Sequence, residues 1–295
     1  MKADLLLVLT AAIWGFAFVA QRLGMTYMGP FTFNAIRFSL GALSLLPLLF
    51  WQNARKGGVV KRPIKKDGLP ILLTGLVLFA GASLQQIGLV GTMAGKAGFI
   101  TGLYVILVPL VALIWGRRTH IAHWSGALLA VGGLYFLSVK EGFVISPYDL
   151  VVLAGAFFWA GHVHLIARYA GRVGPIRLSI GQFLVCGALS ALTAIIFEDI
   201  NVVSVVDGVW PVLYGSFLSV GVAYTLQVVA QRTADPTHAV VILSLEGAFA
   251  ALGGWLVLQE VLTPRDLLGS ALMLTGVLFS QFFGHSGRNQ GSNNR

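Results

Sequence analysis

Apolar stretches of about 20 residues recur along the whole chain, separated by short segments that contain charged residues, glycine and proline. A helix of about 20 residues rises roughly 30 Å, which is the thickness of the hydrocarbon core of a bilayer. The pattern therefore predicts an all-α membrane protein with ten transmembrane helices. The predicted spans are Leu5–Ala20, Phe31–Trp51, Leu69–Val90, Ala97–Trp115, Ile121–Val139, Tyr148–Ile166, Ile176–Phe197, Val209–Ala230, Thr237–Leu258 and Arg265–Phe283.

The basic residues between these spans predict how the chain is oriented. Cytoplasmic loops of membrane proteins carry an excess of Lys and Arg. With the N-terminus inside, 15 of the 20 Lys and Arg residues are cytoplasmic, so both termini are expected on that side. The inner residues are Lys2, Arg55, Lys56, Lys61, Arg62, Lys65, Lys66, Arg117, Arg118, Arg168, Arg172, Arg177, Arg232, Arg288 and Arg295; the outer ones are Arg22, Lys96, Lys140 and Arg265; and Arg37 lies within a span.

The two halves of the chain resemble each other. A shift of 145 residues aligns Trp14 with Trp159 and Pro30 with Pro175, and shifts of 140 and 143 align glycines of the later spans. Each half holds five predicted spans, an odd number, so the second half would enter the membrane from the opposite side. We therefore expect two inverted five-helix repeats, residues 1–141 and 142–284, followed by a disordered cytoplasmic tail at 285–295. Such repeats are common in secondary transporters, whose site lies near the midplane.

The composition argues against several classes of protein. Only 11% of the residues are charged and 57% are hydrophobic, whereas an ordinary soluble domain is about 25% charged. The net charge of +9 is spread over short loops and forms no basic stripe, so no nucleic-acid partner is expected. Cys186 is the only cysteine, which excludes an intramolecular disulfide and a multi-cysteine metal site. No metal or cofactor is expected, and the lack of a Walker A sequence excludes nucleotide hydrolysis by this chain.

Four short motifs lie in order along the predicted spans: Ile13-Trp14-Gly15, Arg37-Phe38, the stretch 92–104 leading to Pro109, and the stretch 244–252 around Glu246. Their order and spacing resemble the EamA-type branch of the drug/metabolite transporter superfamily over about residues 5–283. That family typically has proline after the glutamate, where this chain has Gly247, which permits a bend but does not impose one. The resemblance implies a ten-helix exporter or exchanger of small organic solutes and does not name the solute.

Only two charged residues lie clearly inside predicted spans and away from their ends. Ionisable groups in the bilayer are functional candidates because they are costly to bury. Glu246 is close to the middle of the ninth span, where it could bind a cationic group, carry a coupling proton, or simply hold two helices together. Arg37 lies about 9 Å from the outer end of the second span at 1.5 Å per residue. It could bind a ligand, or its long side chain could extend to the outer water.

Polar and aromatic residues within the other spans complete the predicted substrate site. Polar side chains could line a path or form ordinary interhelical hydrogen bonds. Aromatic residues near mid-depth could form a pocket wall or pack in the core. The predicted substrate-binding residues are Trp14, Asn34, Arg37, Gln86, Tyr104, Trp159, His162, Gln182, Tyr224, Gln227 and Glu246.

The sequence therefore predicts a secondary transporter in a bacterial inner membrane that exports or exchanges a small metabolite, such as an amino acid or an amphipathic compound, by alternating access. Lipid, the solute and coupling protons are the expected partners. A membrane-embedded enzyme is the main alternative, but all seven aspartates lie at span ends or in loops and no His-Glu-x-x-His motif is present. A channel is a second alternative, without a selectivity-filter motif to support it. The Gly98–Gly102 spacing favours internal helix packing, so we expect a monomer or a weak homodimer.

Overall fold

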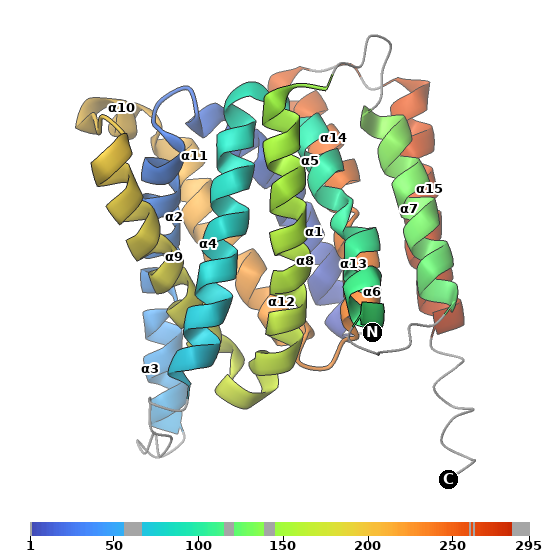
Figure 1. Cartoon of the computed structure of the whole chain (residues 1–295), viewed down its shortest axis with the longest axis horizontal. Helices are drawn as coiled ribbons and strands as arrows, with labels where there is room; N and C mark the ends of the chain where they lie inside the picture. Colours follow the sequence, from blue (N-terminus) through green and yellow to red (C-terminus); the bar gives the residue numbers. More distant parts are fainter. Residues whose placement is uncertain are drawn as a thin grey trace.

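The structure is a computed structural model that describes residues 2–55, 67–114, 121–138, 145–259, 261 and 263–284. All regular secondary structure in these residues is helical, and the long helices run side by side (Figure 1). The helices are α1 (Lys2–Gly24), α2 (Pro30–Ser44), α3 (Leu46–Arg55), α4 (Gly68–Gly91), α5 (Ala94–Gly102), α6 (Tyr104–Ile114), α7 (Ile121–Ser138), α8 (Pro147–Val173), α9 (Pro175–Phe197), α10 (Val202–Asp207), α11 (Val209–Leu213), η2 (Tyr214–Tyr224), α12 (Thr225–Ala230), α13 (Pro236–Leu243), α14 (Glu246–Leu258) and α15 (Pro264–Gly284).

Some sequence-based expectations fall on other parts of the chain. The predicted disordered tail, residues 285–295, lies outside the described residues. So do ten of the basic residues that predicted the orientation: Lys56, Lys61, Arg62, Lys65, Lys66, Arg117, Arg118, Lys140, Arg288 and Arg295.

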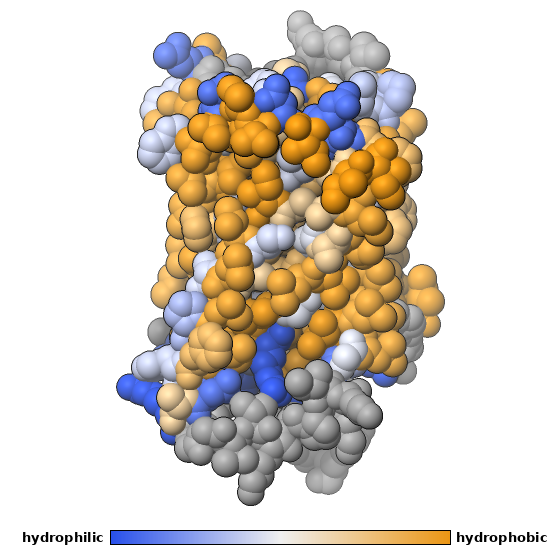
Figure 2. Space-filling model, turned by 90° about the vertical axis from the view of Figure 1, so that its left-hand side faces the viewer, coloured by the Kyte–Doolittle hydropathy of each residue, from blue (hydrophilic) through white to orange (hydrophobic). Residues whose placement is uncertain are grey.

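Eight segments of the described chain are long and apolar enough to cross a membrane. They are α1, α2 with α3, α4, α5 with α6, α8, α9, α11 through α12, and α13 with α14. Two further apolar helices, Ile121–Phe136 and Leu267–Ser280, are shorter. In Figure 2 hydrophobic residues cover the middle of one face, and hydrophilic residues gather toward its two ends. This surface is what a multi-pass membrane protein presents to lipid.

Local sequence explains where several helices begin. Ser146 and Asp149 form a capping box at the start of α8, because the Asp149 amide donates to Ser146 Oγ at 3.3 Å and the Ser146 amide donates to Asp149 Oδ2 at 2.6 Å. Asp235 caps α13 by accepting from the Thr237 amide at 2.9 Å. Gly174 separates α8 from α9 with a φ of 94°, a conformation that favours glycine.

Two of the spans are interrupted near their middle. One residue, Leu103, separates α5 from α6, and two residues, Ser244 and Leu245, separate α13 from α14. At these points the amides of Leu103 and Leu245 bond to the carbonyl three residues earlier, at 3.2 and 3.1 Å, in place of the four-residue spacing of an α-helix. The helix that follows each interruption begins with a polar residue, Tyr104 in α6 and Glu246 in α14.

Both interruptions approach the same side chain, Leu134 of α7, which is fully buried. A Cβ atom added at Gly102 would lie 2.9 Å from Leu134 Cδ1, and one added at Gly247 would lie 2.6 Å from Leu134 Cδ2. The two glycines therefore let α7 pack closely against both interruptions. Gly98 and Gly102 face the interior of the bundle, as their spacing predicted.

The predicted eighth span contains an 11-residue π-helix, η2. Side chains of α1 bond to its carbonyl groups: Thr10 Oγ1 donates to Ala223 O and Trp14 Nε1 donates to Ser219 O, both at 3.3 Å. The Tyr214 hydroxyl donates in the other direction, to Ile13 O, at 2.9 Å. A π-helix is rarely this long and is frequently found at functional sites. Donor side chains of α1 thus bond to backbone carbonyl groups of the π-helix.

Each of the long helices packs against specific neighbours. α2 packs along α9, and α7 packs along α15. α4 packs against α8 and α9, while η2 packs against α1 and α2. α5 and α6 lie against α8, and α13 and α14 lie against α1. The start of α1 and the end of α15 lie at the same end of the molecule (Figure 1).

Candidate functional site

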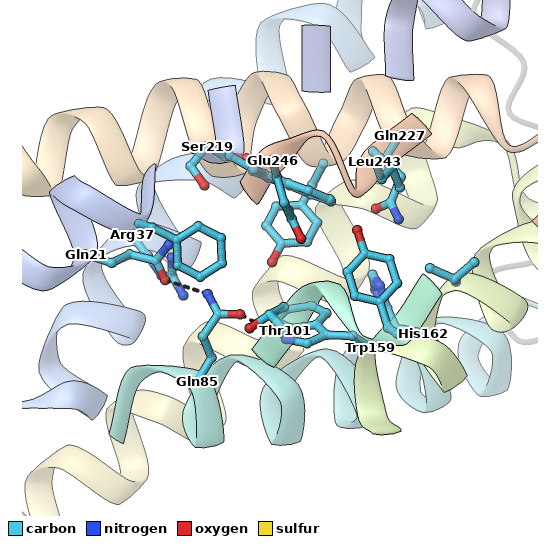
Figure 3. Close-up of a pocket in the computed structure, with 15 residues that line it drawn as sticks. Gln21, Arg37, Gln85, Thr101, Trp159, His162, Ser219, Gln227, Leu243 and Glu246 are labelled. Atoms are coloured by element: carbon cyan, nitrogen blue, oxygen red, sulfur yellow. Dashed lines mark hydrogen bonds between the residues drawn. The ribbon is translucent and has the colours of Figure 1, made fainter. Parts of the chain in front are cut away.

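A cavity of about 460 Å³, part of it open to solvent, lies between α1, α2, α4, α5, α6, α8, η2, α12, α13 and α14. The residues that line it are Trp14, Phe18, Gln21, Arg37, Gln85, Thr101, Tyr104, Trp159, His162, Val163, Ser219, Tyr224, Gln227, Leu243 and Glu246. Figure 3 shows Gln21, Arg37 and Gln85 on one side, His162 and Gln227 on the other, and Glu246 between them.

Glu246 is the one carboxyl group among the residues that line this cavity. It is 3% exposed, and within the described residues its Oε1 atom has no hydrogen-bond partner. The interruption between α13 and α14 turns its side chain toward the cavity (Figure 3). Tyr104, from the other interrupted span, lines the same cavity, and within the described residues its hydroxyl likewise has no hydrogen-bond partner. The two helix interruptions thus bring a phenol and a carboxyl together.

Arg37 provides the positive charge. It is 1% exposed, and its guanidinium lies over the rings of Phe38 and Phe33, with centroid distances of 4.8 and 5.4 Å. Its Nε donates to Asn34 Oδ1 at 2.9 Å, and among the described residues Nη2 has no acceptor and no carboxylate forms an ion pair with it. The sequence-based alternative in which Arg37 extends to the outer water does not describe this side chain.

A network of amide side chains closes the cavity beside Arg37. Gln85 Nε2 donates to Gln21 Oε1 at 3.1 Å, and Gln86 Nε2 donates to the Gln21 carbonyl at 3.1 Å. Gln85 also accepts from Trp159 Nε1 at 3.0 Å. These bonds connect α1, α4 and α8 at one side of the site.

The wall of the cavity is aromatic and centres on Tyr224, the last residue of η2. Trp14 meets the Tyr224 ring edge-on at a centroid distance of 4.6 Å, and Trp159 and His162 lie 6.1 and 6.2 Å away. His162 Nε2 is 2.8 Å from Gln182 Oε1, which fixes the imidazole ring. This wall suits the apolar part of a solute, while the charged groups and amides suit its polar part.

Eight of the eleven predicted site residues line the cavity: Trp14, Arg37, Tyr104, Trp159, His162, Tyr224, Gln227 and Glu246. The other three lie behind its wall. Asn34 holds Arg37, Gln182 holds His162, and Gln86 bonds to the α1 backbone. A role of any of these residues in substrate binding stays a prediction.

Four polar residues of the cavity are absent from the predicted set: Gln21, Gln85, Thr101 and Ser219. Gln85 and Gln86 are adjacent, and successive residues of a helix point about 100° apart, so only one of them can face the cavity. The sequence pattern identified the pair but not which member faces inward. Gln21 lies just beyond the end predicted for the first span, where a polar residue carries little information.

Comparisons with known proteins agree with this architecture. The EamA-like transporter family matches residues 1–139 and 146–282. A protein of Archaeoglobus fulgidus named as an uncharacterized transporter is 36% identical over 283 residues, which cover 94% of this chain and 85% of that protein. The threonine/homoserine exporter RhtA of Escherichia coli K12 is 29% identical over 287 residues, which cover 94% of this chain and 90% of that protein.

A solved structure, titled only as the crystal structure of a protein, has the same fold. Its TM-score is 0.76 and its sequence identity is 21%, over 94% of this chain and 96% of that one. A likeness at this identity supports the helical architecture and carries no information about the solute.

Proposed function

The chain belongs to the EamA-like transporter family, and from this premise we propose that it is a secondary transporter that exports or exchanges small zwitterionic metabolites of the amino-acid class. The observation that carries this proposal is the pair of buried opposite charges, Arg37 and Glu246, in one cavity. A buried charge without a partner is strongly unfavourable. A solute that carries both a carboxylate and an ammonium group would satisfy both residues at once.

The similarity to a threonine/homoserine exporter supports the same class of solute and the outward direction. In this scheme Arg37 binds the carboxylate, Glu246 binds the ammonium group, and the aromatic wall around Tyr224 surrounds the remainder. When the solute is absent, the Glu246 carboxyl can take up a proton, which would couple export to proton entry.

Alternating access would be produced by two inverted repeats, residues 1–141 and 142–284. The two stretches matched by the family, 1–139 and 146–282, support this division. The helix pairings support it too. If the two repeats are interchanged, the packing of α4 against α8 corresponds to the packing of η2 against α1. In the same way, the packing of α5 and α6 against α8 corresponds to the packing of α13 and α14 against α1.

Efflux from reconstituted vesicles tests the proposal directly. Vesicles that contain the protein and a mixture of amino acids should lose a subset of them at least about tenfold faster than vesicles with the double variant Arg37→Met, Glu246→Gln. Equal loss from both preparations would contradict the amino-acid assignment. Loss of an apolar amine in place of any amino acid would favour an amphipathic compound as the solute.

We further propose that the ten spans lie in a bacterial inner membrane with both termini cytoplasmic. Single cysteines report this orientation once Cys186 is replaced, and that residue is buried. A cysteine at Arg55 should react with an impermeant maleimide only after cells are permeabilised, whereas a cysteine at Asp199 should react from outside. The reverse pattern would contradict the orientation.

A further inference from the structure

The outer side of the cavity is connected to a second guanidinium, that of Arg22. Arg22 follows Gln21 in α1, and Gln21 lines the cavity beside Arg37. The Arg22 Nη1 atom donates to the carbonyl oxygens of Leu89 and Val90 at the end of α4. Together with the bonds from Gln85 and Gln86 to Gln21, these contacts join α1 to α4 just beyond the cavity.

The carbonyls that Arg22 binds have no partner within their own helix. The last backbone bond of α4 runs from the Thr92 amide to Gly88 O at 2.9 Å, so the carbonyls of Leu89 and Val90 lie beyond it. The end of a helix is electronegative and attracts a cation. These acceptors are nevertheless neutral, and in the described part of the chain no carboxylate forms an ion pair with Arg22.

A free carboxylate is a better partner for this guanidinium than two carbonyl groups. A carboxylate can accept two parallel N–H bonds from one guanidinium, and its negative charge adds an attraction that the two neutral carbonyl groups lack. Arg22 is half-buried and Val90 is exposed, so the Val90 carbonyl can be solvated when Arg22 leaves it, whereas Leu89 is fully buried. Breaking these bonds would free α1 from α4 at the outer side of the cavity.

We propose that Arg22 is a release site for the carboxylate of the departing solute and that, when no solute is present, the same guanidinium closes the outer mouth by binding the end of α4. This inference rests on the proposed function. Arg37 and Arg22 would then bind the carboxylate in succession, one inside the cavity and one at its outer edge. Arrival of the solute at Arg22 would itself release the contact between α1 and α4.

Arg22→Gln and Arg22→Lys test this proposal, with Arg55→Ala as a matched control. Arg55 also carries a surface guanidinium, 4.0 Å from the centre of the Trp51 ring, but far from the cavity. Each variant is made with Cys186 replaced, and a second version of each, used only for labelling, also carries Thr101→Cys in the cavity as a reporter. The three measurements are the rate of Thr101→Cys labelling by an impermeant maleimide without solute, amino-acid efflux from vesicles, and amino-acid affinity in detergent.

In Arg22→Gln we expect labelling to be about tenfold faster, because the mouth is no longer held closed, and efflux to be about tenfold slower, because the release site is lost. Affinity in the cavity should change less than about twofold. Arg22→Lys should recover part of both rates, and Arg55→Ala should change neither.

Unchanged labelling or unchanged efflux in Arg22→Gln would overturn the proposal. So would a loss of efflux in parallel with thermal stability, which is the result expected if Arg22 only caps α4. If the protein without the Arg22 change moves no amino acid at all, the proposed function fails, and this inference fails with it.

Discussion

The two interrupted spans, α5 with α6 and α13 with α14, have the same geometry but carry different chemistry. Each starts at one surface with a short helix, is interrupted beside Leu134 of α7, and presents a polar side chain to the cavity from the first residue of its second helix. That side chain is Tyr104 in one span and Glu246 in the other. A phenol loses its proton only near pH 10, whereas a carboxyl can carry a negative charge at neutral pH.

The two spans are also anchored differently. Lys96 of α5 binds Asp149 of α8 at 2.6 Å, while His238 of α13 binds Asp4 of α1 at 2.9 Å. Asp149 has further bonds to Thr92 and to the first turn of its own helix. If the two repeats proposed above arose by duplication, one scaffold is present twice and the charged side chain at the interruption lies on a single copy. The predictions below test how far the two copies differ.

The largest effect is expected from Glu246→Gln. The amide preserves the size of the side chain but removes its charge and its proton, so reconstituted transport should fall more than about tenfold between about pH 5.5 and about pH 8. Thermal stability in detergent should be unchanged or higher, because an unpaired buried charge is removed. Normal flux at every pH in this variant, with an unstable Glu246→Ala, would identify Glu246 as a structural residue.

The next effect is expected where α14 packs on α1. A Cβ atom at Gly15 would lie 2.7 Å from the carbonyl carbon of Phe249 and 2.8 Å from the amide nitrogen of Ala250, and backbone atoms cannot move aside easily. Gly15→Ala should therefore destabilise the protein by about 1–3 kcal/mol or more.

Gly161→Ala is the matched control for that substitution. Its new Cβ atom would meet only Val77 Cγ1, at an ordinary 3.8 Å, and alanine favours a helix over glycine by up to about 1 kcal/mol. Thermal melts in one detergent compare the two variants. An equal loss of stability in both would mean that packing of α14 on α1 is not the cause.

The two anchors should differ in strength. Asp149→Asn removes a mostly buried ion pair and weakens the cap of α8, so we expect a loss of about 2 kcal/mol after allowing for partial solvent screening at Lys96. Asp4→Asn should cost about 1 kcal/mol or less, because the Asp4 side chain is more exposed than that of Asp149. Unfolding midpoints in a common denaturant check the order, and the reverse order would contradict the comparison.

The smallest effect is expected from Tyr104→Phe, which removes only a hydroxyl beside Glu246. Loss of one hydrogen-bonding group is typically worth about 1 kcal/mol, so flux should fall by a few-fold and not be abolished. Initial transport rates in vesicles, measured for this variant and for Glu246→Gln, compare the contributions of Tyr104 and Glu246 to transport. If both variants lose transport equally, the two interruptions contribute equally and the specialisation of one copy is wrong.

Much of the helical framework follows from apolar periodicity alone. The predicted span Leu69–Val90 is one residue shorter than α4 at each end, and the predicted span Ile176–Phe197 starts one residue after α9, because charge, glycine and proline mark those ends clearly. The interruption before Glu246 could not be predicted in the same way, since no proline imposes it. It depends on Gly247 and Gly102 packing against Leu134, which is a tertiary contact.

Site residues could be predicted from the sequence where burial of a polar side chain is costly, and they were difficult to predict elsewhere. Arg37 and Glu246 stand out in any apolar sequence, and they lie in the same cavity. The π-helical winding of η2 was not predictable, because it depends on bonds from Thr10 and Trp14 of a distant span. Thr101 was missed because a small hydroxyl residue is common in apolar helices.

The central claim is that Arg37 and Glu246 bind the two charges of one zwitterion. Titration calorimetry of the purified protein tests it with three ligands: an amino acid that the vesicle assay identifies, its carboxamide without the carboxylate, and its deaminated acid without the ammonium group. We expect the amino acid to bind at least about tenfold more tightly than either analogue, with the preference over the carboxamide lost in Arg37→Met and the preference over the deaminated acid lost in Glu246→Gln. Equal binding of all three ligands to the unaltered protein would contradict the claim.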